Sequence, residues 1–292
     1  MAGKLREVRR RIRSVKSTQK ITRAMELIAA SRIVKATART HAAKPYADEI
    51  SKIVAELVRR GGSGSELLVP REGDRVGVIA VTADRGLAGA YNTNVLKLVE
   101  AERRRAGAEF SVYAYGRKSL SFYRFRKVTP VAEWQGYSDT PPYEVAKEIG
   151  QKVTEDYLAG HLDKVLIAYT QFQTMLTQTP VIEQLLPVLP PESSESAEPV
   201  EGVQADVEFE PDAESILASL LPRYVESRVF SALLNAAASE HAARRRAMKA
   251  ATDNADDIIK ILTRDANRAR QAEITTEISE IVGGAEALAA EG

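Results

Sequence analysis

The residues best suited to chemistry in this 292-residue sequence lie in the stretch ADRGLAGAYN, Ala83–Asn92. It follows an apolar run, Val76–Val81, and phosphate-binding loops often follow a strand in this way. A dinucleotide-binding turn needs three glycines spaced G-x-G-x-x-G, and a P-loop ends in G-K-[ST]. Only Gly86 and Gly89 stand in this turn, and no lysine follows before Lys97. We interpret the stretch as a tight turn of an ordinary α/β unit and predict no nucleotide site there.

The histidines suggest neither a metal site nor a catalytic triad. They are far apart in the sequence, at His41, His161 and His241. Ser239, Glu240 and His241 combine the residue types of a nucleophile, an acid and a base. Consecutive helical residues point in different directions, however, so a packed or solvated helix face is the better interpretation.

Pairs of carboxylates near the C-terminus indicate helix-surface ion pairs rather than acid–base catalysis. These pairs are Asp256 with Asp257 and Glu277 with Glu280. The sequence contains no cysteine, which excludes disulfides and thiolate metal sites. We predict no catalytic residue, no cofactor-binding residue and no metal ligand in this chain.

Charge is distributed unevenly along the chain. The net charge is +1, but the first forty residues hold twelve Lys or Arg against two Glu, which suggests an acidic partner. A nucleic-acid binder using REVRRRIR (Arg6–Arg13) is an alternative, although it lacks a recognised fold motif and a basic patch interleaved with aromatic residues. No apolar run reaches eighteen residues, and the start is too charged for a secretory signal. We expect a soluble, intracellular protein.

Long helices are expected at both ends. Glycine is absent between Lys4 and Arg60, and neither glycine nor proline occurs between Arg223 and Val282. The apolar residues follow the three–four spacing of a coiled coil, with an apparent break between Val15 and Ile21. The positions carrying this spacing are Leu5, Val8, Ile12 and Val15, then Met248, Ala251, Ala255, Ile258 and Leu262, then Ile274, Ile278 and Ile281. One helix at each terminus indicates antiparallel pairing across an inserted domain.

The middle of the chain alternates strand and helix patterns, which predicts a mostly parallel sheet covered by helices. Strands are expected at Val76–Val81, Phe110–Tyr115, Val128–Trp134, Lys164–Tyr169 and Thr179–Val188, and helices at Asn92–Arg105 (capped by Asn92), Arg117–Phe125 and Tyr143–Leu158. An acidic Pro- and Ser-containing stretch follows, which we interpret as a loop or disordered insert. The expected domains are an N-terminal coiled-coil helix at 1–60, an α/β domain at 74–190, the acidic loop at 191–208 and a C-terminal coiled-coil helix at 209–292.

Long stretches of the two termini resemble one known family. SVKSTQKITRAMELIAASRI (Ser14–Ile33), SEHAARRRAMKAATDNADDIIKIL (Ser239–Leu262) and NRARQAEITTEISEIVGGAEAL (Asn267–Leu288) are similar to the gamma subunit of bacterial F-type ATP synthases. The turn DRGLAGAYN and the segment FEPD (Phe209–Asp212) resemble the same family. Arg245 and Arg246 depart from its usual pattern, and the absence of cysteine excludes the thiol regulation of some photosynthetic members.

The resemblance implies a non-catalytic rotor shaft that couples ion flow through a membrane ring to ATP synthesis or hydrolysis. It implies a long antiparallel coiled coil of terminal helices with an inserted Rossmann-like α/β foot, and one copy per complex. The implied partners are the alpha, beta and epsilon subunits and the c-ring, with no cofactor, no nucleic acid, and membrane association only through the c-ring. The implied location is peripheral, on the cytoplasmic face of the bacterial plasma membrane.

The resemblance also carries two sets of partner residues onto this sequence. Contacts to the ring of alpha and beta subunits are implied for Arg9, Lys20, Arg23, Met25, Arg270, Gln271, Thr275, Glu277, Ile278 and Ile281. Contacts of the foot with epsilon or the c-ring are implied for Phe209 and Glu210. The apolar residues from Ile274 to Leu288 would turn in a hydrophobic sleeve or pack on the N-terminal helix.

Overall fold

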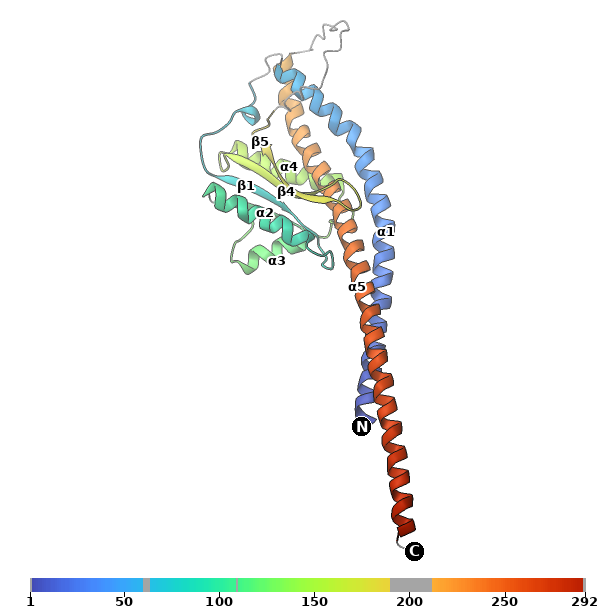
Figure 1. The fold of residues 1–292 in the computed structure, drawn as a ribbon. Coiled ribbons are helices and arrows are strands. Elements are labelled where there is room, and N and C mark those ends of the chain that lie inside the picture. The colour runs from blue at the N-terminus through green and yellow to red at the C-terminus, as the bar shows by residue number, and fades with distance from the viewer. Residues whose placement is uncertain (1, 60–63, 109, 190–211, 291–292) are drawn as a thin grey trace. The chain divides into compact units, whose positions relative to one another are not determined.

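The computed structural model describes residues 2–59, 64–108, 110–189 and 212–290 (Figure 1). The chain divides into two compact units. The terminal unit combines Met1–Ile28 with Arg245–Gly292, and the central unit is Ala29–Arg244. Helices α1 (Ala2–Arg59) and α5 (Ala213–Ala290) contribute residues to both units. A search of the described part of the chain finds no helix with the length and apolar character needed to span a membrane.

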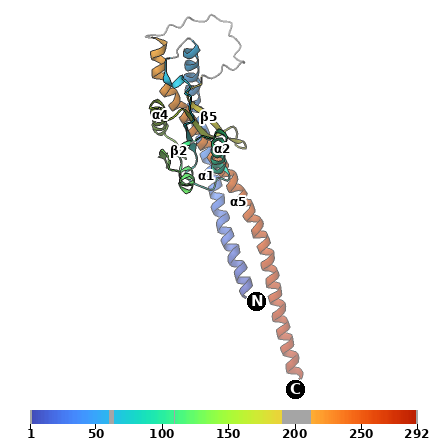
Figure 2. The ribbon, with the colours of Figure 1, turned by 90° about the vertical axis from the view of Figure 1, so that its left-hand side faces the viewer.

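The two helix segments of the terminal unit run antiparallel. Gln19 Nε2 donates a hydrogen bond to Asp256 Oδ1 at 2.5 Å, and the hydroxyl oxygens of Thr22 and Thr252 lie 2.8 Å apart. A forward step along α1 therefore matches a backward step along α5. Figures 1 and 2 both show the end of α5 running past the start of α1.

The seam between these segments continues where the sequence analysis expected a break. Ile21 is 57% exposed and lies outside the seam, while Thr22 is buried. The seam keeps its three–four spacing because polar residues occupy two of its positions. It comprises Leu5, Val8, Ile12, Val15, Gln19 and Thr22 on α1. The expected break is therefore wrong.

On α5 the seam is displaced by one residue at two predicted positions. Ile258 is 43% exposed, whereas its neighbour Ile259 is half-buried, and Thr252 is more deeply buried than Ala251. The residues that alternate by three and four on the covered side are Met248, Thr252, Ala255, Ile259, Leu262 and Ala266. The predicted seam and the observed seam both have heptad spacing, so the sequence pattern does not distinguish them, whereas the packing of the two helices does.

The central unit contains a five-stranded sheet in the order β3-β2-β1-β4-β5. The strands are β1 (Val76–Val81), β2 (Phe110–Tyr115), β3 (Ala132–Trp134), β4 (Lys164–Phe172) and β5 (Gln178–Leu186). Strands β1 to β4 pair with one another in parallel, and β5 returns antiparallel beside β4. The helices are α2 (Tyr91–Ala106), α3 (Arg117–Phe125) and α4 (Tyr143–Leu158), with a short 3₁₀ helix at Glu66–Leu68. The predicted α/β class with a mostly parallel sheet is confirmed.

Helices cover both faces of this sheet, as a parallel sheet requires. Strand β1 is buried along its whole length, and its residues alternate between two apolar clusters. Val78 and Ala80 belong to the cluster with α2 and α3. Ile79 and Val81 belong to the larger cluster, which includes α4 and residues of α1 and α5 from the central unit. Helix α5 is thus part of the core of the central unit.

Several predicted boundaries shift by a few residues. Helix α2 begins at Tyr91, and Asn92 does not cap it: the Asn92 side-chain oxygen accepts a hydrogen bond from the Ala83 N–H at 2.8 Å. The expected strand at Val128–Trp134 is shorter, because only its last three residues pair with β2. The strand expected at Thr179–Val188 begins one residue earlier and ends at Leu186.

Candidate functional site

The turn Ala83–Asn92 is organised around the carboxylate of Asp84. Asp84 Oδ1 accepts the Arg117 N–H at 3.0 Å, and Oδ2 accepts the Ser138 N–H at 3.0 Å. Burial alone would raise the pKa of this carboxyl, but N–H groups of Gly136, Ser138 and Arg117 outweigh it, and the pKa lies below its ordinary value. The carboxylate therefore ties the end of β1 to the start of α3 and to the loop before α4.

Helix α5 fills the place where an open parallel sheet usually binds a ligand, beyond the carboxyl ends of its strands. The Tyr91 hydroxyl donates a hydrogen bond to the Ala236 carbonyl at 3.1 Å, and the Ser239 hydroxyl donates to the Thr170 carbonyl at 3.0 Å. Ala243 packs against the small cluster of Ala83, Ala88 and Tyr91. The space beside the turn is therefore occupied by side chains of α5.

Ser239, Glu240 and His241 are all buried, and each has its own partner. Arg244 Nη2 lies 2.5 Å from Glu240 Oε1, and both side chains are less than a tenth exposed. Burial raises the pKa of the Glu240 carboxyl above its ordinary value, although Arg244 opposes the shift. His241 Nε2 lies 3.4 Å from the Asp139 carbonyl oxygen, and burial lowers the pKa of the imidazole. The three residues form a packed helix face and no triad, as predicted.

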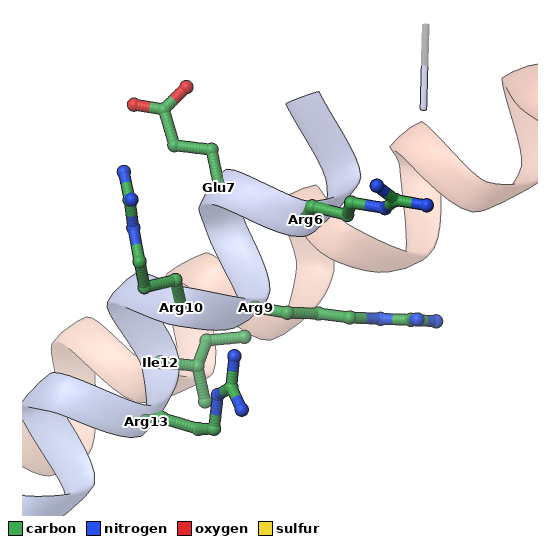
Figure 3. A pocket seen from close by; sticks show the side chains of 6 residues that line it. All are labelled: Arg6, Glu7, Arg9, Arg10, Ile12 and Arg13. Atoms are coloured by element: carbon green, nitrogen blue, oxygen red, sulfur yellow. The ribbon is translucent and has the colours of Figure 1, made fainter. Parts of the chain in front are cut away.

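A basic surface covers the start of α1 in the terminal unit. Figure 3 shows Arg6, Arg9 and Arg13 extending to one side of the helix, while Glu7 and Arg10 extend to another. Together with Ile12 they line an open hollow of about 900 Å³. Four guanidinium groups beside one carboxylate make this hollow strongly positive, so it favours an acidic partner.

The other residues assigned to the ring from the first helix differ in exposure. Lys20 is exposed and Met25 is half-buried. The Arg23 side chain is 60% exposed, and its Nη1 lies 3.7 Å from Glu26 Oε2. The Glu26 side chain is only 12% exposed, so Arg23 is the exposed member of a half-buried pair.

The end of α5 is an exposed helix with an apolar side. Ala266 is the last buried residue in the described part of the helix. Beyond it, Ile278 is 57% exposed and Ile281 is 71% exposed, with Ile274 and Val282 about half exposed. The N-terminal helix therefore does not cover this side in the isolated chain.

The polar residues predicted near the same end are also exposed. They are Arg270, Gln271, Thr275 and Glu277. Gln271 and Thr275 lie one turn apart, and the Thr275 hydroxyl donates a hydrogen bond to the Gln271 carbonyl at 2.9 Å. The Gln271 side chain remains available to a partner.

The carboxylate pairs behave differently from one another. Asp257 pairs with Lys260 at 3.0 Å, as expected, and Asp256 accepts a hydrogen bond from Gln19 across the seam. Within the described ranges, neither Glu277 nor Glu280 has an ion-pair partner, so the expected surface pairs are absent there. A search of the same ranges for clusters of three or more metal-ligating side chains finds none.

The predicted foot contacts Phe209 and Glu210 and the predicted acidic loop at 191–208 lie outside the described residues.

Comparisons with known proteins agree along the whole chain. A family model described as ATP synthase matches residues 4–288. The chain is 51% identical to an ATP synthase gamma chain of Acidothermus cellulolyticus, with 100% of this chain and 99% of that protein covered. It is 50% identical to the gamma chain of Frankia casuarinae, with 99% of both covered. The chain belongs to the ATP synthase gamma chain family.

Solved structures of ATP synthase rotors share the fold of this gamma-family chain. One from Euglena gracilis mitochondria has a TM-score of 0.68 at 15% identity, covering 94% of this chain and 100% of that one. A central stalk from Tetrahymena thermophila mitochondria has a TM-score of 0.60 at 22% identity, covering 79% of this chain and 99% of that one. A gamma chain is a non-catalytic subunit of the ATP synthase complex, as predicted, and nothing in these comparisons supports the nucleic-acid alternative.

Sequence reasoning about this gamma-family chain missed the polar contacts in its central unit. Arg32 Nη1 lies 2.5 Å from Asp139 Oδ2, and Glu240 pairs with Arg244. The second pair had a signal, because Glu and Arg four residues apart face each other on a helix. The first pair had none, since more than a hundred residues separate its members. Arg245 and Arg246, which depart from the family pattern, are exposed.

Proposed function

We propose that this chain is the rotating central shaft of a bacterial F-type ATP synthase. The observation that carries the proposal is the match to gamma chains at about half identity over essentially the full length. Ion flow through the membrane c-ring turns the foot, and the shaft presents a different side to each catalytic subunit in turn. Because one asymmetric shaft cannot contact several like subunits equally, it couples rotation to unequal nucleotide affinities.

The basic surface of α1 is the proposed contact with acidic loops of the beta subunits. Arg9 lies in the hollow of Figure 3, and Lys20 and Arg23 extend the positive charge along the helix. Met25 adds a half-buried apolar contact. Exposed cations attract an acidic surface at long range and exchange partners readily, which suits a contact that must be remade during rotation.

The end of α5 is the proposed contact with the upper part of the alpha–beta ring. Ile278 and Ile281 are exposed in the isolated chain, and an apolar sleeve would remove them from water. Arg270, Gln271, Thr275 and Glu277 provide hydrogen-bonding groups on the same stretch. Such groups can hold the shaft at particular angles while the apolar side turns.

The proposed foot contacts place the central unit on the epsilon subunit and the c-ring, with Phe209 and Glu210 among the contact residues. One copy of the chain is expected in each complex. The chain would then be peripheral on the cytoplasmic face of the plasma membrane and held there through the c-ring.

Purification of the chain from its own cells tests this function. The expected result is a complex containing alpha, beta and epsilon, with three alpha and three beta subunits for each copy of the chain. A chain that purifies without alpha and beta but binds DNA with a steep salt dependence would refute the proposal in favour of the nucleic-acid alternative.

A further inference from the structure

The turn Ala83–Asn92 and the segment of α5 that it contacts form a set of directional contacts in the central unit. The contact residues are Tyr91 and Gly86 on the turn and Ala236, Ala243 and Arg244 on the helix. We call this set the clasp. Resting on the proposed rotor function, we propose that the clasp fixes the rotational angle of α5 against the sheet and so transmits torque between shaft and foot.

Apolar packing alone does not fix that angle. Helix α5 contributes buried residues such as Leu221, Val225 and Leu233 to the larger core of the central unit. The hydrophobic effect holds these surfaces together, but it has no direction, so a helix can roll or slip while it keeps most of its burial. Resistance to rotation about the helix axis requires directional contacts.

The clasp provides such contacts on the side of α5 that faces the turn. The buried Tyr91 hydroxyl donates to the Ala236 carbonyl at 3.1 Å. Two helical turns further on, Arg244 Nη2 lies 3.5 Å from the Gly86 carbonyl oxygen and 2.5 Å from Glu240 Oε1. Glu240 is 1% exposed, so water cannot replace it as the partner of Arg244.

The turn is itself anchored to the sheet. Asp84 accepts two N–H groups, one from the start of α3 and one from the loop before α4. The Asn92 side chain closes the turn on the Ala83 N–H. A force that rotates α5 therefore passes through the turn into several strands and helices at once. This structural role explains why the turn follows a strand as a phosphate-binding loop does but lacks most of the residues typical of such a loop.

Loosening the clasp in the complete membrane enzyme tests the inference. Glu240→Gln with Arg244→Met removes the buried pair without leaving one charge alone, and Tyr91→Phe removes one hydroxyl and keeps the ring. The matched control is Lys249→Met with Asp253→Asn, an exposed pair with the same spacing. ATP hydrolysis and ATP-driven proton pumping are measured in the same vesicles. We expect pumping per ATP hydrolysed to fall at least twofold in both clasp variants and to stay unchanged in the control.

A reversible crosslink adds a readout that mere loss of folding would not produce. The chain has no native cysteine, so Ala88→Cys and Ala243→Cys can be added to the Tyr91→Phe variant. Oxidation should restore the pumping ratio, and reduction should lower it again. An unchanged ratio in intact clasp variants, or a formed crosslink that leaves the ratio low, would overturn the clasp. Wild-type chain that fails to assemble with alpha and beta would instead overturn the rotor function.

Discussion

The exposed end of α5 allows one consequence of the rotor function to be calculated. Ile278 and Ile281 are 57% and 71% exposed, so an apolar sleeve would bury somewhat more than one whole isoleucine side chain between them. Burying an isoleucine stabilises by about 1.5–3 kcal/mol, which gives about 2–4 kcal/mol for the pair. Replacing both with glutamine, a good helix former, should weaken binding to the alpha–beta ring by about 30- to 700-fold.

Titration of a labelled chain with purified alpha–beta ring measures this change directly. The stability of the isolated variant should stay within about 0.5 kcal/mol of wild type, because both side chains already face solvent. Leu158→Gln is the matched control, since Leu158 is 46% exposed on the central unit. An affinity of the double variant within twofold of wild type, with the ring intact, would show that no sleeve covers these residues.

Two further predictions concern polar residues. Replacing Arg270 and Gln271 together with alanine should slow steady-state ATP hydrolysis several-fold while the complex still purifies intact, with Arg264→Ala as control; an unchanged rate in intact complexes would leave both residues as ordinary helix surface. Asp84→Ala should destabilise the isolated chain at pH 7 by about 1–3 kcal/mol, because it leaves the Arg117 and Ser138 N–H groups without their acceptor. Since the folded-state pKa of Asp84 is lowered, its contribution to stability is present above the ordinary pKa of about 3.9 and is lost as pH falls through the folded value. Urea unfolding should therefore show the difference between wild type and variant shrinking at acid pH, and a difference that stays constant down to that range would contradict the assigned role.

The strands and helices of this fold that have a regular local pattern of apolar residues were predictable from the sequence. The apolar run Val76–Val81 forms a strand with the expected bounds. The helix at Tyr143–Leu158 also has the bounds that its spacing predicted. Apolar spacing failed in the terminal unit, because Gln19 and Thr22 keep the heptad with polar side chains that find polar partners across the seam. A pattern of apolar residues cannot show such a pairing.

The candidate site was predictable only in part. Exposure of the polar residues near Arg270 follows from a charged, regular helix, whereas burial of Glu240 and Arg244 does not. These two residues are buried because α5 enters the crevice beyond the strands, and the turn that receives it lies about 150 residues earlier in the chain. Contacts over such separations depend on the topology of the whole central unit.

The polar seam positions of the terminal unit also determine how its two helices can move along each other. Slipping α5 by one heptad would set Thr22 opposite Ile259 or Arg245 instead of Thr252, and Gln19 would lose Asp256. Each lost hydrogen bond costs about 0.5–1.5 kcal/mol, so losing both disfavours the slipped register by about 1–3 kcal/mol. The two polar pairs therefore favour one axial position of the helices over the positions one heptad away, and they oppose a seven-residue slip in either direction.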